Sequence, residues 1–502
     1  MCQSELQFVF SGPMKSMLCH GIGARCLKAY FTCPDIFQTE KLIERRLLHL
    51  FLQTLCGLVL RCVYLCLPYS LEPTCGMARK DTELPLVKVQ PQQKGPGGIT
   101  VQAFLERMSD RVRIDSNFTG KHDIDNSVKE LITRLMKSIV TKDTRFESSL
   151  IETGSSYDGT KISSPNEYDY LAVMTRFSNE NCVRVMRVCH NNRGFAHVQL
   201  RDNKGQTWTD LVTDSRILVT KHFRDRFRFL CHETINERRF EGTIESPTGS
   251  LSIEGYDVSI NGPQCNVKLK WRPVRGENIT ISVDVCPTIS YSRLEDVLQA
   301  KDTANQFVYK TMLTFKHVHL IPRPQSECRQ CFKLVFAEAD RRVIEELSDS
   351  HKRCLLILKC IASKWTERDG RLNKFFNSFA LKMAVLHHSY ICDTKYDIQH
   401  CIVGILGDLK RRLEEPVPMM PSVFINKHNV WGNLFQSGKA VDVLRLNTSV
   451  SLLKSSMTFF QMLPSRFESE HVCDQKFKDF WKLCRYSFRK GTRLMSITEL
   501  ID

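Results

Sequence analysis

The segment that decides the fold reads Thr153-Gly-Ser-Ser-Tyr-Asp-Gly-Thr-Lys-Ile-Ser-Ser-Pro-Asn-Glu-Tyr-Asp-Tyr-Leu-Ala-Val-Met174. It places Gly154 and Ser155 about a dozen residues before an acidic pair, Glu167 and Asp169. The run Glu-Tyr-Asp-Tyr-Leu-Ala-Val predicts a strand, and the two-residue spacing points both carboxylates to one face of it. Two carboxylates on one face repel each other unless a cation lies between them. Mg²⁺ suits such oxygen ligands because it keeps waters and substrate phosphates as its other ligands.

A third carboxylate occurs in the alternating run Ile279-Thr-Ile-Ser-Val-Asp-Val285, where Asp284 lies opposite the apolar face. If this strand lies beside the first, the three acids can hold two Mg²⁺ or Mn²⁺ ions about 3.5–4 Å apart, as nucleotidyl transfer requires. Gly154 then lets the backbone approach a triphosphate, and Ser155 donates hydrogen bonds to its oxygens. Each acid alone is explained as well by an exposed strand edge. The combination favours a metal-nucleotide site.

The composition is that of a globular protein with a polyanionic partner. The chain has 502 residues, 42% of them hydrophobic, and a formal net charge of +16. This charge favours nucleic acid or an anionic membrane surface, although a basic protein without such a partner is the alternative. The 21 cysteines lack the regular spacing of a secreted disulfide framework, so we expect reduced thiols in a cytoplasmic or nuclear protein.

Composition also predicts the domain boundaries. Residues 1–76 form a Cys-rich apolar leader whose run Leu47 to Tyr69 is interrupted by Arg61, so a membrane span is not expected there, and translation that starts at Met77 is an alternative. Residues 77–98 read as a flexible linker because of their Pro and Gly content. We expect an α+β core over 99–325, a helical lobe over 326–464 and a basic extension over 465–502.

Several of these segments resemble cyclic GMP-AMP synthase and the related receptors, a family of innate-immune nucleotidyltransferases that includes the male-abnormal (Mab) developmental proteins. The resemblance rests on Thr-Gly-Ser-Ser-Tyr, Lys-Ile-Ser-Ser-Pro-Asn-Glu-Tyr-Asp, Ile-Ser-Val-Asp284 and His319-Leu-Ile-Pro322, and it covers most of residues 99–440. It implies a bilobal nucleotidyltransferase fold with long N-terminal spine helices. It also implies that Glu167, Asp169 and Asp284 are the metal ligands.

The same resemblance implies further nucleotide contacts. Within Asn377-Ser-Phe-Ala-Leu-Lys382, Ser378 and Lys382 look like the family's nucleotide contacts, and Phe379 stands where the family has a base-stacking tyrosine. Lys333 and Lys359 resemble basic residues that contact base or phosphate. The alternative is a core aromatic residue and lysines on solvated faces.

The sequence also bears on zinc binding and on the nucleic-acid activator. The vertebrate synthase carries a zinc-binding His and Cys insertion that this chain lacks, and we expect no zinc from the substitutes Cys328, Cys331, His351 and Cys354, because a loop holds the first pair and a distant helix the second. Without that insertion the expected activator is double-stranded RNA, with DNA as the alternative. The residues expected to grip a duplex by charge and shape are Lys129, Arg134, Lys137, Lys142, Arg145, Lys221, Arg224, Arg226, Arg228, Arg238 and Arg239.

The sequence therefore predicts an enzyme that binds a duplex, reorders the loop Gly154 to Ser164, and makes a cyclic dinucleotide from ATP and GTP. The expected product is mixed-linkage cyclic GMP-AMP, formed in innate immune sensing, and a homodimer on nucleic acid is compatible with the resemblance. Two alternatives stay open. One is a transferase that forms linear oligonucleotides, and the other is a non-catalytic nucleic-acid-binding or developmental member of the family, against which an intact acidic triad counts.

Overall fold

The computed structural model describes residues 98–480 apart from 114–119, 190–191, 202–207, 258–261, 324–327, 368–369, 394–396, 427, 432–439 and 470. The predicted leader, nearly all of the linker and residues 481–502 lie outside the described residues, and so does the apolar run Leu47 to Tyr69. Within the described ranges, no helix is long and apolar enough to cross a membrane.

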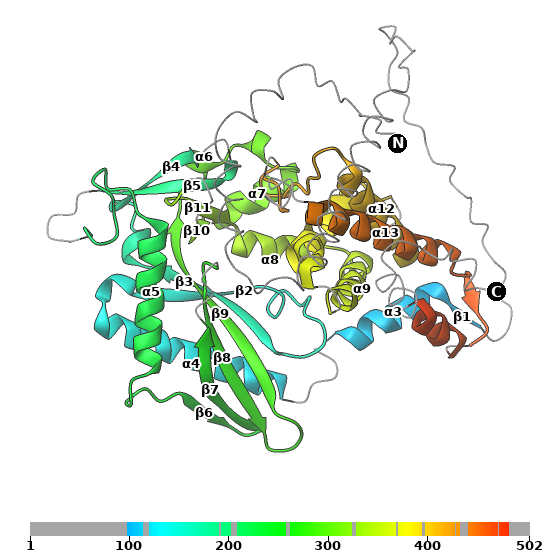
Figure 1. Cartoon of the computed structure of the whole chain (residues 1–502), viewed down its shortest axis with the longest axis horizontal. Coiled ribbons are helices and arrows are strands. Elements are labelled where there is room, and N and C mark those ends of the chain that lie inside the picture. The colour runs from blue at the N-terminus through cyan, green and yellow to red at the C-terminus, as the bar shows by residue number, and fades with distance from the viewer. Residues whose placement is uncertain are drawn as a thin grey trace, which may run out of the picture. The chain divides into compact units, whose positions relative to one another are not determined.

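The fold is α+β, as predicted, and a ten-stranded sheet runs through one lobe (Figure 1). Its main path has the order β4-β5-β11-β10-β9-β8-β7-β6, and β3 joins it beside β9, with β2 on the other side of β3. The strands are β2 (Ser148–Thr153), β3 (Glu167–Met174), β4 (Val183–Cys189), β5 (Asn192–Leu200), β6 (Thr243–Ser246), β7 (Gly249–Asp257), β8 (Cys265–Pro273), β9 (Ile279–Tyr291), β10 (Val318–Pro322) and β11 (Phe332–Val335).

Strand β9 pairs with three other strands of this sheet. Its first half pairs antiparallel with β8, its last residues pair antiparallel with β10, and its middle lies parallel to β3. The predicted alternation holds, because Ile281, Val283 and Val285 are fully buried while Asp284 stays on the other face. The apolar face therefore anchors β9 in the core and presents its carboxylate to the opposite side.

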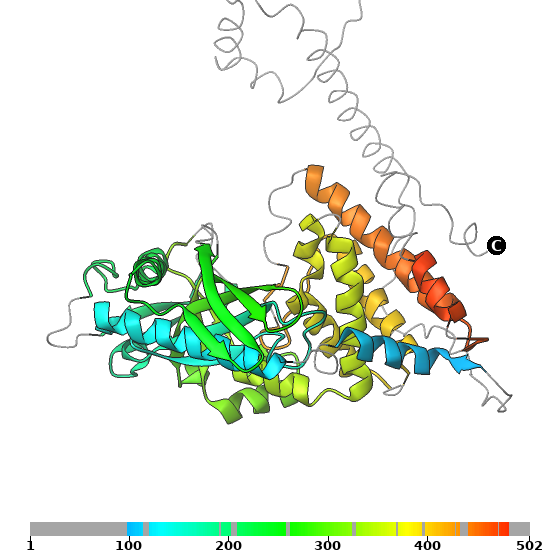
Figure 2. The same ribbon diagram turned by 90° about the horizontal axis from the view of Figure 1, so that it is seen from below.

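Two helices cover the sheet lobe: α4 (Lys121–Lys142) and α5 (Thr220–Ile235), which pack against each other. A set of apolar residues of α4 recurs at three- and four-residue spacing, a pattern that predicts one buried face, and every member of the set is buried in the core: Val128, Leu131, Ile132, Leu135, Met136 and Ile139. An amphipathic helix with such a stripe buries one face and leaves its charged face outside. Figure 2 shows α4 along the edge of this lobe.

The second lobe is helical, as predicted, and Figure 2 shows it beside the sheet lobe. Its main helices are α8 (Ala337–Glu345), α9 (Asp349–Thr366), α10 (Asn373–Phe376), α11 (Ser378–Ser389), α12 (Ile398–Glu414) and α13 (Ala440–Met462). The shorter α6 (Leu294–Val297) and α7 (Gln306–Phe315) lie in the connection between strands β9 and β10. The apolar pattern of residues 343–364 predicts helix throughout, but the structure divides this segment between α8 and α9 at Ser348. The Ser348 side chain accepts a hydrogen bond from the His351 amide and so caps a new helix.

The two lobes do not follow the predicted sequence boundary at residue 325, because each contains a segment from the other side of it. Strand β11 lies beyond it in sequence but pairs with β10 and β5 inside the sheet. Conversely, helix α3 (Val101–Val112) precedes the sheet but packs against α9 and α12. The predicted C-terminal extension also begins inside the helical lobe, where β12 (Arg466–Phe467) pairs with β1 (Ile99–Thr100) and Phe477 stacks near Phe104.

Candidate active site

Strands β3 and β9 bring the three predicted carboxylates together. In their parallel register Asp169 lies directly opposite Asp284, and Glu167 lies opposite Ser282. The two aspartates thus stand side by side on adjacent strands, and Glu167 stands two residues before Asp169 on the same face. All three line one cavity.

The turn that follows β2 is shaped around Asp169. Gly154 has φ +78°, a left-handed conformation that residues with a Cβ rarely adopt. A Cβ at this position would lie 2.0 Å from Oδ2 of Asp169, closer than real Cβ atoms come to any neighbour. Gly154 is therefore required both by the backbone and by the close approach of the carboxylate.

The environment of the aspartates is short of positive charge. Burial, and then repulsion from Glu167 and Asp284, raise the pKa of Asp169 to about 7. Burial also raises the pKa of Asp284, although a hydrogen bond from Asn266 to its Oδ1, at 2.5 Å, opposes that shift. Raised pKa values at paired acids are typical of functional carboxylates.

Glu167 differs from its partners because its side chain is 57% exposed and forms an ion pair with Lys161, with 2.6 Å between Nζ and Oε2. Lys161 belongs to the loop between β2 and β3, so the position of that loop decides how Glu167 is neutralised. The site fits a divalent cation: it offers oxygen ligands alone, and the mutual repulsion of its carboxylates is what a cation would relieve.

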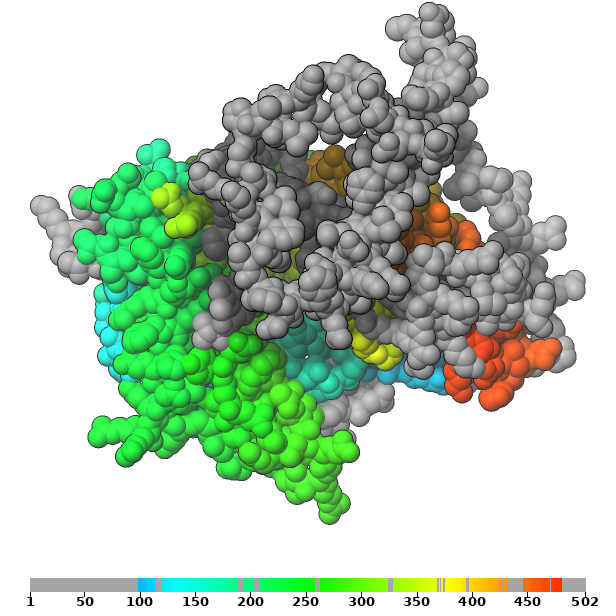
Figure 3. All heavy atoms as spheres, in the orientation of Figure 1, coloured from blue at the N-terminus to red at the C-terminus, as the bar shows by residue number. Residues whose placement is uncertain are grey.

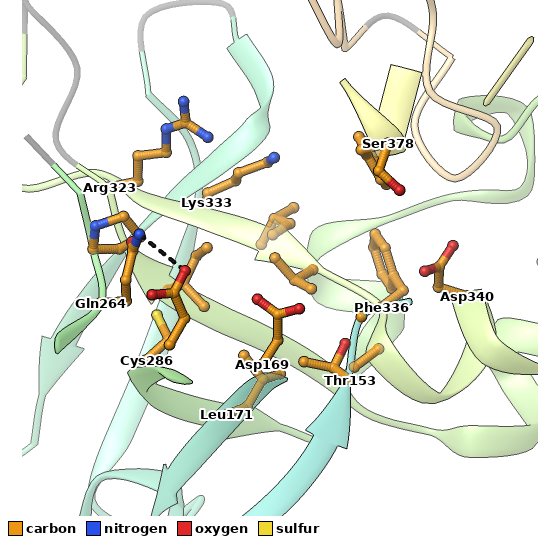
Figure 4. A pocket seen from close by; sticks show the side chains of 18 of the residues that line it. Thr153, Asp169, Leu171, Gln264, Cys286, Arg323, Lys333, Phe336, Asp340 and Ser378 are labelled. Carbon is orange, nitrogen blue, oxygen red and sulfur yellow. Dashed lines mark hydrogen bonds between the residues drawn. The ribbon is translucent and has the colours of Figure 1, made fainter. Parts of the chain in front are cut away.

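The cavity has a volume of about 750 Å³, within the roughly 300–1,000 Å³ typical of ligand sites. Figure 4 shows Asp169 pointing into it, with Lys333 and Ser378 across the opening. Gly154, Ser155, Phe379 and Lys382 also line it, so most of the predicted nucleotide contacts are brought to one cavity. Lys359 is the exception among them, since it is buried outside the lining.

Lys333 and Phe379 form one wall of the cavity. The Lys333 ammonium lies 5.3 Å from the centre of the Phe379 ring, a cation–π contact that joins β11 to α11. Burial, and then the nearby Arg323 guanidinium, lower the pKa of Lys333 to about 8. An aromatic face beside a cationic side chain suits a planar, electron-rich group with an anionic neighbour.

The two other lysines hold the loop between β2 and β3. Lys382 forms ion pairs with Asp158 of that loop and with Asp340 of α8, at 3.3 Å for the second pair, and its side chain is only 5% exposed. The Lys359 ammonium donates to the carbonyl oxygen of Thr160 at 2.6 Å. In this conformation both ammonium groups contact the loop between β2 and β3, and their predicted role as nucleotide contacts stays a prediction.

The predicted duplex-binding residues divide into three groups: buried, exposed, and paired with acidic side chains. Arg224 and Arg228 are buried, so their expected contact with a phosphate backbone is corrected: Arg228 donates to the carbonyl oxygens of Gly262 and Gln264. Four are exposed: Lys137, Lys221, Arg238 and Arg239. Figure 3 shows α5, which carries Lys221, at the surface. The others are paired with acidic side chains: Lys129 with Glu152, Arg134 with Glu130 and Glu241, Lys142 with Glu233 and Glu237, Arg145 with Asp143 and Asp210, and Arg226 with Asp143.

The substitutes weighed for a zinc site do not converge. Cys328 and Cys331 gather with His197 beside β5, whereas His351 lies in a different group in the helical lobe. The two pairs thus lie in different places, and this separation is the reason that no zinc is expected from this set.

Sequence reasoning missed the residues that support Asp284 from the neighbouring strand. Asn266 and Gln264 both donate to its carboxylate, and Arg228 fixes the backbone of Gln264. Asn266 stands opposite Asp284 in the β8–β9 register. Asn266 lies on the polar face of the alternating run Cys265–Pro273, and its role can be inferred only once the pairing of β8 with β9 is known.

The comparison with protein families agrees with this geometry. Residues 156–346 match the family model described as the Mab-21 protein nucleotidyltransferase domain. The matched segment begins just after Ser155, spans β3 and β9 with all three carboxylates, and ends with α8. Residues 156–346 are therefore similar to the Mab-21 nucleotidyltransferase domain.

Proposed function

We propose that this protein is an Mg²⁺-dependent nucleotidyltransferase that joins ATP and GTP into a cyclic dinucleotide when it binds a nucleic-acid duplex. The observation that carries the proposal is the meeting of Glu167, Asp169 and Asp284 at one cavity, beside a turn shaped by Gly154. Three carboxylates held together cost stability unless they bind a cation, so their presence at one cavity favours catalysis over binding alone.

The chain's own groups account for substrate positioning. Ser155 and the backbone of its turn would donate hydrogen bonds to the triphosphate, which lies next to the carboxylates. Bound Mg²⁺ would supply charge neutralisation and a more acidic ribose hydroxyl. Across the cavity, Phe379 would stack on a base while Lys333 pairs with phosphate or base oxygens.

The loop between β2 and β3 offers a route for activation. Its amide at Ser163 donates to the carbonyl oxygen of Val112, the last residue of α3, at 3.1 Å. Its Asp158 and Thr160 contact the buried lysines of the helical lobe, and its Lys161 pairs with Glu167. A duplex that shifts the N-terminal helix α3 would therefore move the loop, and the loop would change the ion pair of Glu167.

Exposed Lys137 and Lys221, together with the adjacent basic residues, support a duplex as the ligand. Double-stranded RNA is proposed first and DNA second, and recognition would follow charge and shape, because these residues form no base-reading motif. We extend the same proposal to the product, mixed-linkage cyclic GMP-AMP. It also includes dimerisation on the duplex and a role in innate immunity.

The test is product analysis by mass spectrometry. The full-length protein would be incubated with ATP, GTP and Mg²⁺, alone and with long double-stranded RNA or DNA. We expect a cyclic dinucleotide with one duplex and none with the Asp169→Asn variant. Linear oligonucleotides would favour the transferase alternative, and duplex binding without any product would favour the non-catalytic alternative.

A further inference from the structure

Four metal-binding side chains converge in the helical lobe, apart from the candidate active site. His351 comes from the first turn of α9, His388 from the last turn of α11, Cys392 from just after α11 and Cys401 from the first turn of α12. Their ligand atoms all lie within 4.8 Å of one another. His388, Cys392 and Cys401 lie close together in the sequence, whereas His351 comes from an earlier helix, so the packing of three helix ends is what assembles the four.

The distances within this His/Cys group match a tetrahedral metal site. The two sulfur atoms of Cys392 and Cys401 are 3.5 Å apart, and Sγ of Cys401 lies 3.8 Å from Nε2 of His351. With zinc–sulfur bonds of about 2.3 Å and zinc–nitrogen bonds of about 2.0–2.1 Å, a tetrahedron separates two sulfurs by about 3.8 Å and a sulfur from a nitrogen by about 3.6 Å. An ion would fit with small side-chain adjustments.

Surrounding residues orient both imidazoles. The Ser348 hydroxyl lies 2.7 Å from Nδ1 of His351, which leaves Nε2 to face the sulfur of Cys401. Such a partner on the other ring nitrogen is typical of metal-binding histidines. Gly404 makes room for the second ring, because a Cβ there would lie 2.8 Å from Cε1 of His388.

His388 supplies an independent observation. Its Nε2 is buried and has no hydrogen-bond partner among the residues that the structure describes. A buried polar atom of this kind costs free energy unless a ligand satisfies it. A disulfide between Cys392 and Cys401 would explain the two sulfurs but would leave Nε2 of His388 without a partner.

We propose that His351, His388, Cys392 and Cys401 bind one structural Zn²⁺ ion. Two neutral imidazoles and two thiolates fill a tetrahedron, and two thiol protons are released on binding. A site with four protein ligands has no open position, so its role is to tie helix ends together. Helix α11 carries Phe379 into the cavity at its other end, so the ion would fix the helix that forms that wall.

The test uses the full-length chain, purified under reducing conditions, loaded with ZnCl₂ and dialysed before elemental analysis. The variants are Cys392→Ser and His388→Gln. Two controls are matched thiol substitutions: Cys360→Ser on α9, outside both groups, and Cys331→Ser in the separate group with His197. Cobalt(II) loading gives a second readout, because tetrahedral thiolate sites have an intense visible spectrum.

We expect about one zinc ion per chain in the wild type and in both controls, and none in Cys392→Ser or His388→Gln. Zinc should raise the Tm of the wild type but not the Tm of Cys392→Ser or His388→Gln. The Tm readout applies to the metal-free wild type, so the proposal stays testable if a variant folds poorly. A wild type that binds no zinc, a Cys392→Ser variant that keeps it, or loss in Cys331→Ser instead would overturn the proposal.

Discussion

The close packing of Gly154 against Asp169 predicts the effect of one methyl group. In Gly154→Ala the new Cβ would start 2.0 Å from Oδ2 of Asp169, whereas real Cβ atoms essentially never approach closer than 3.0 Å. The carboxylate must therefore move by about 1 Å, the difference between these two distances. A misplacement of that size costs about 10²-fold in rate, or about 2.7 kcal/mol of transition-state stabilisation.

Gly159→Ala is the matched control, because it lies in the same loop with φ +72°. A Cβ there meets nothing closer than the Arg113 guanidinium at 4.0 Å. Both variants carry the same cost of about 1–2 kcal/mol for a side chain in the left-handed conformation. The extra effect of Gly154→Ala is thus the displacement of Asp169.

The assay is the rate of nucleotidyl transfer at saturating ATP, GTP and Mg²⁺, with Mn²⁺ affinity measured by calorimetry beside it. We expect Gly154→Ala to lose about 10²-fold in rate and to bind Mn²⁺ more weakly, and Gly159→Ala to keep both within a few-fold. Equal rates and equal Mn²⁺ affinities in the two variants would refute the reasoning.

Three further predictions follow from the site. Because the pKa of Asp169 is raised to about 7, the free energy of unfolding of the metal-free protein should fall by a few kcal/mol between about pH 4 and pH 7, and Asp169→Asn should flatten this dependence in urea titrations. Lys382→Met, which leaves two buried carboxylates without their cation, should cost about 3–5 kcal/mol, against less than about 0.5 kcal/mol for exposed Lys137→Met. Lys137→Glu combined with Lys221→Glu should weaken duplex binding and flatten its salt dependence, as measured by fluorescence anisotropy, whereas unchanged binding would remove this face from the interface.

Much of the catalytic strand pair could be predicted from the sequence. The alternation of Ile279 to Val285 and the two-residue spacing of Glu167 and Asp169 fix which face each carboxylate occupies, because a strand has a period of two. The pairing of β3 with β9 joins residues more than a hundred positions apart. No local pattern specifies this pairing, so the sequence predicts only that the three acids meet if the two strands lie side by side.

The lysines were harder to predict. Lys359 and Lys382 lie on helices whose apolar neighbours are buried, and the sequence does not show that Thr160 and Asp158 of a distant loop reach them. Arg228 had the same difficulty, because a basic helix indicates a charged face without telling which arginine turns inward. In each case the partner comes from tertiary packing, which also assembles His351 with Cys401.

The central claim is that the acidic triad transfers nucleotides, and pyrophosphate release tests it most directly. The full-length protein would be assayed with ATP, GTP, Mg²⁺ and each duplex, beside Asp284→Asn and the control Glu245→Gln, an exposed acid on β6 of the same sheet. We predict duplex-dependent pyrophosphate release that Glu245→Gln retains and Asp284→Asn loses by at least about 10²-fold. Release that persists in Asp284→Asn, or none from a folded wild type that binds the duplex, would contradict the account.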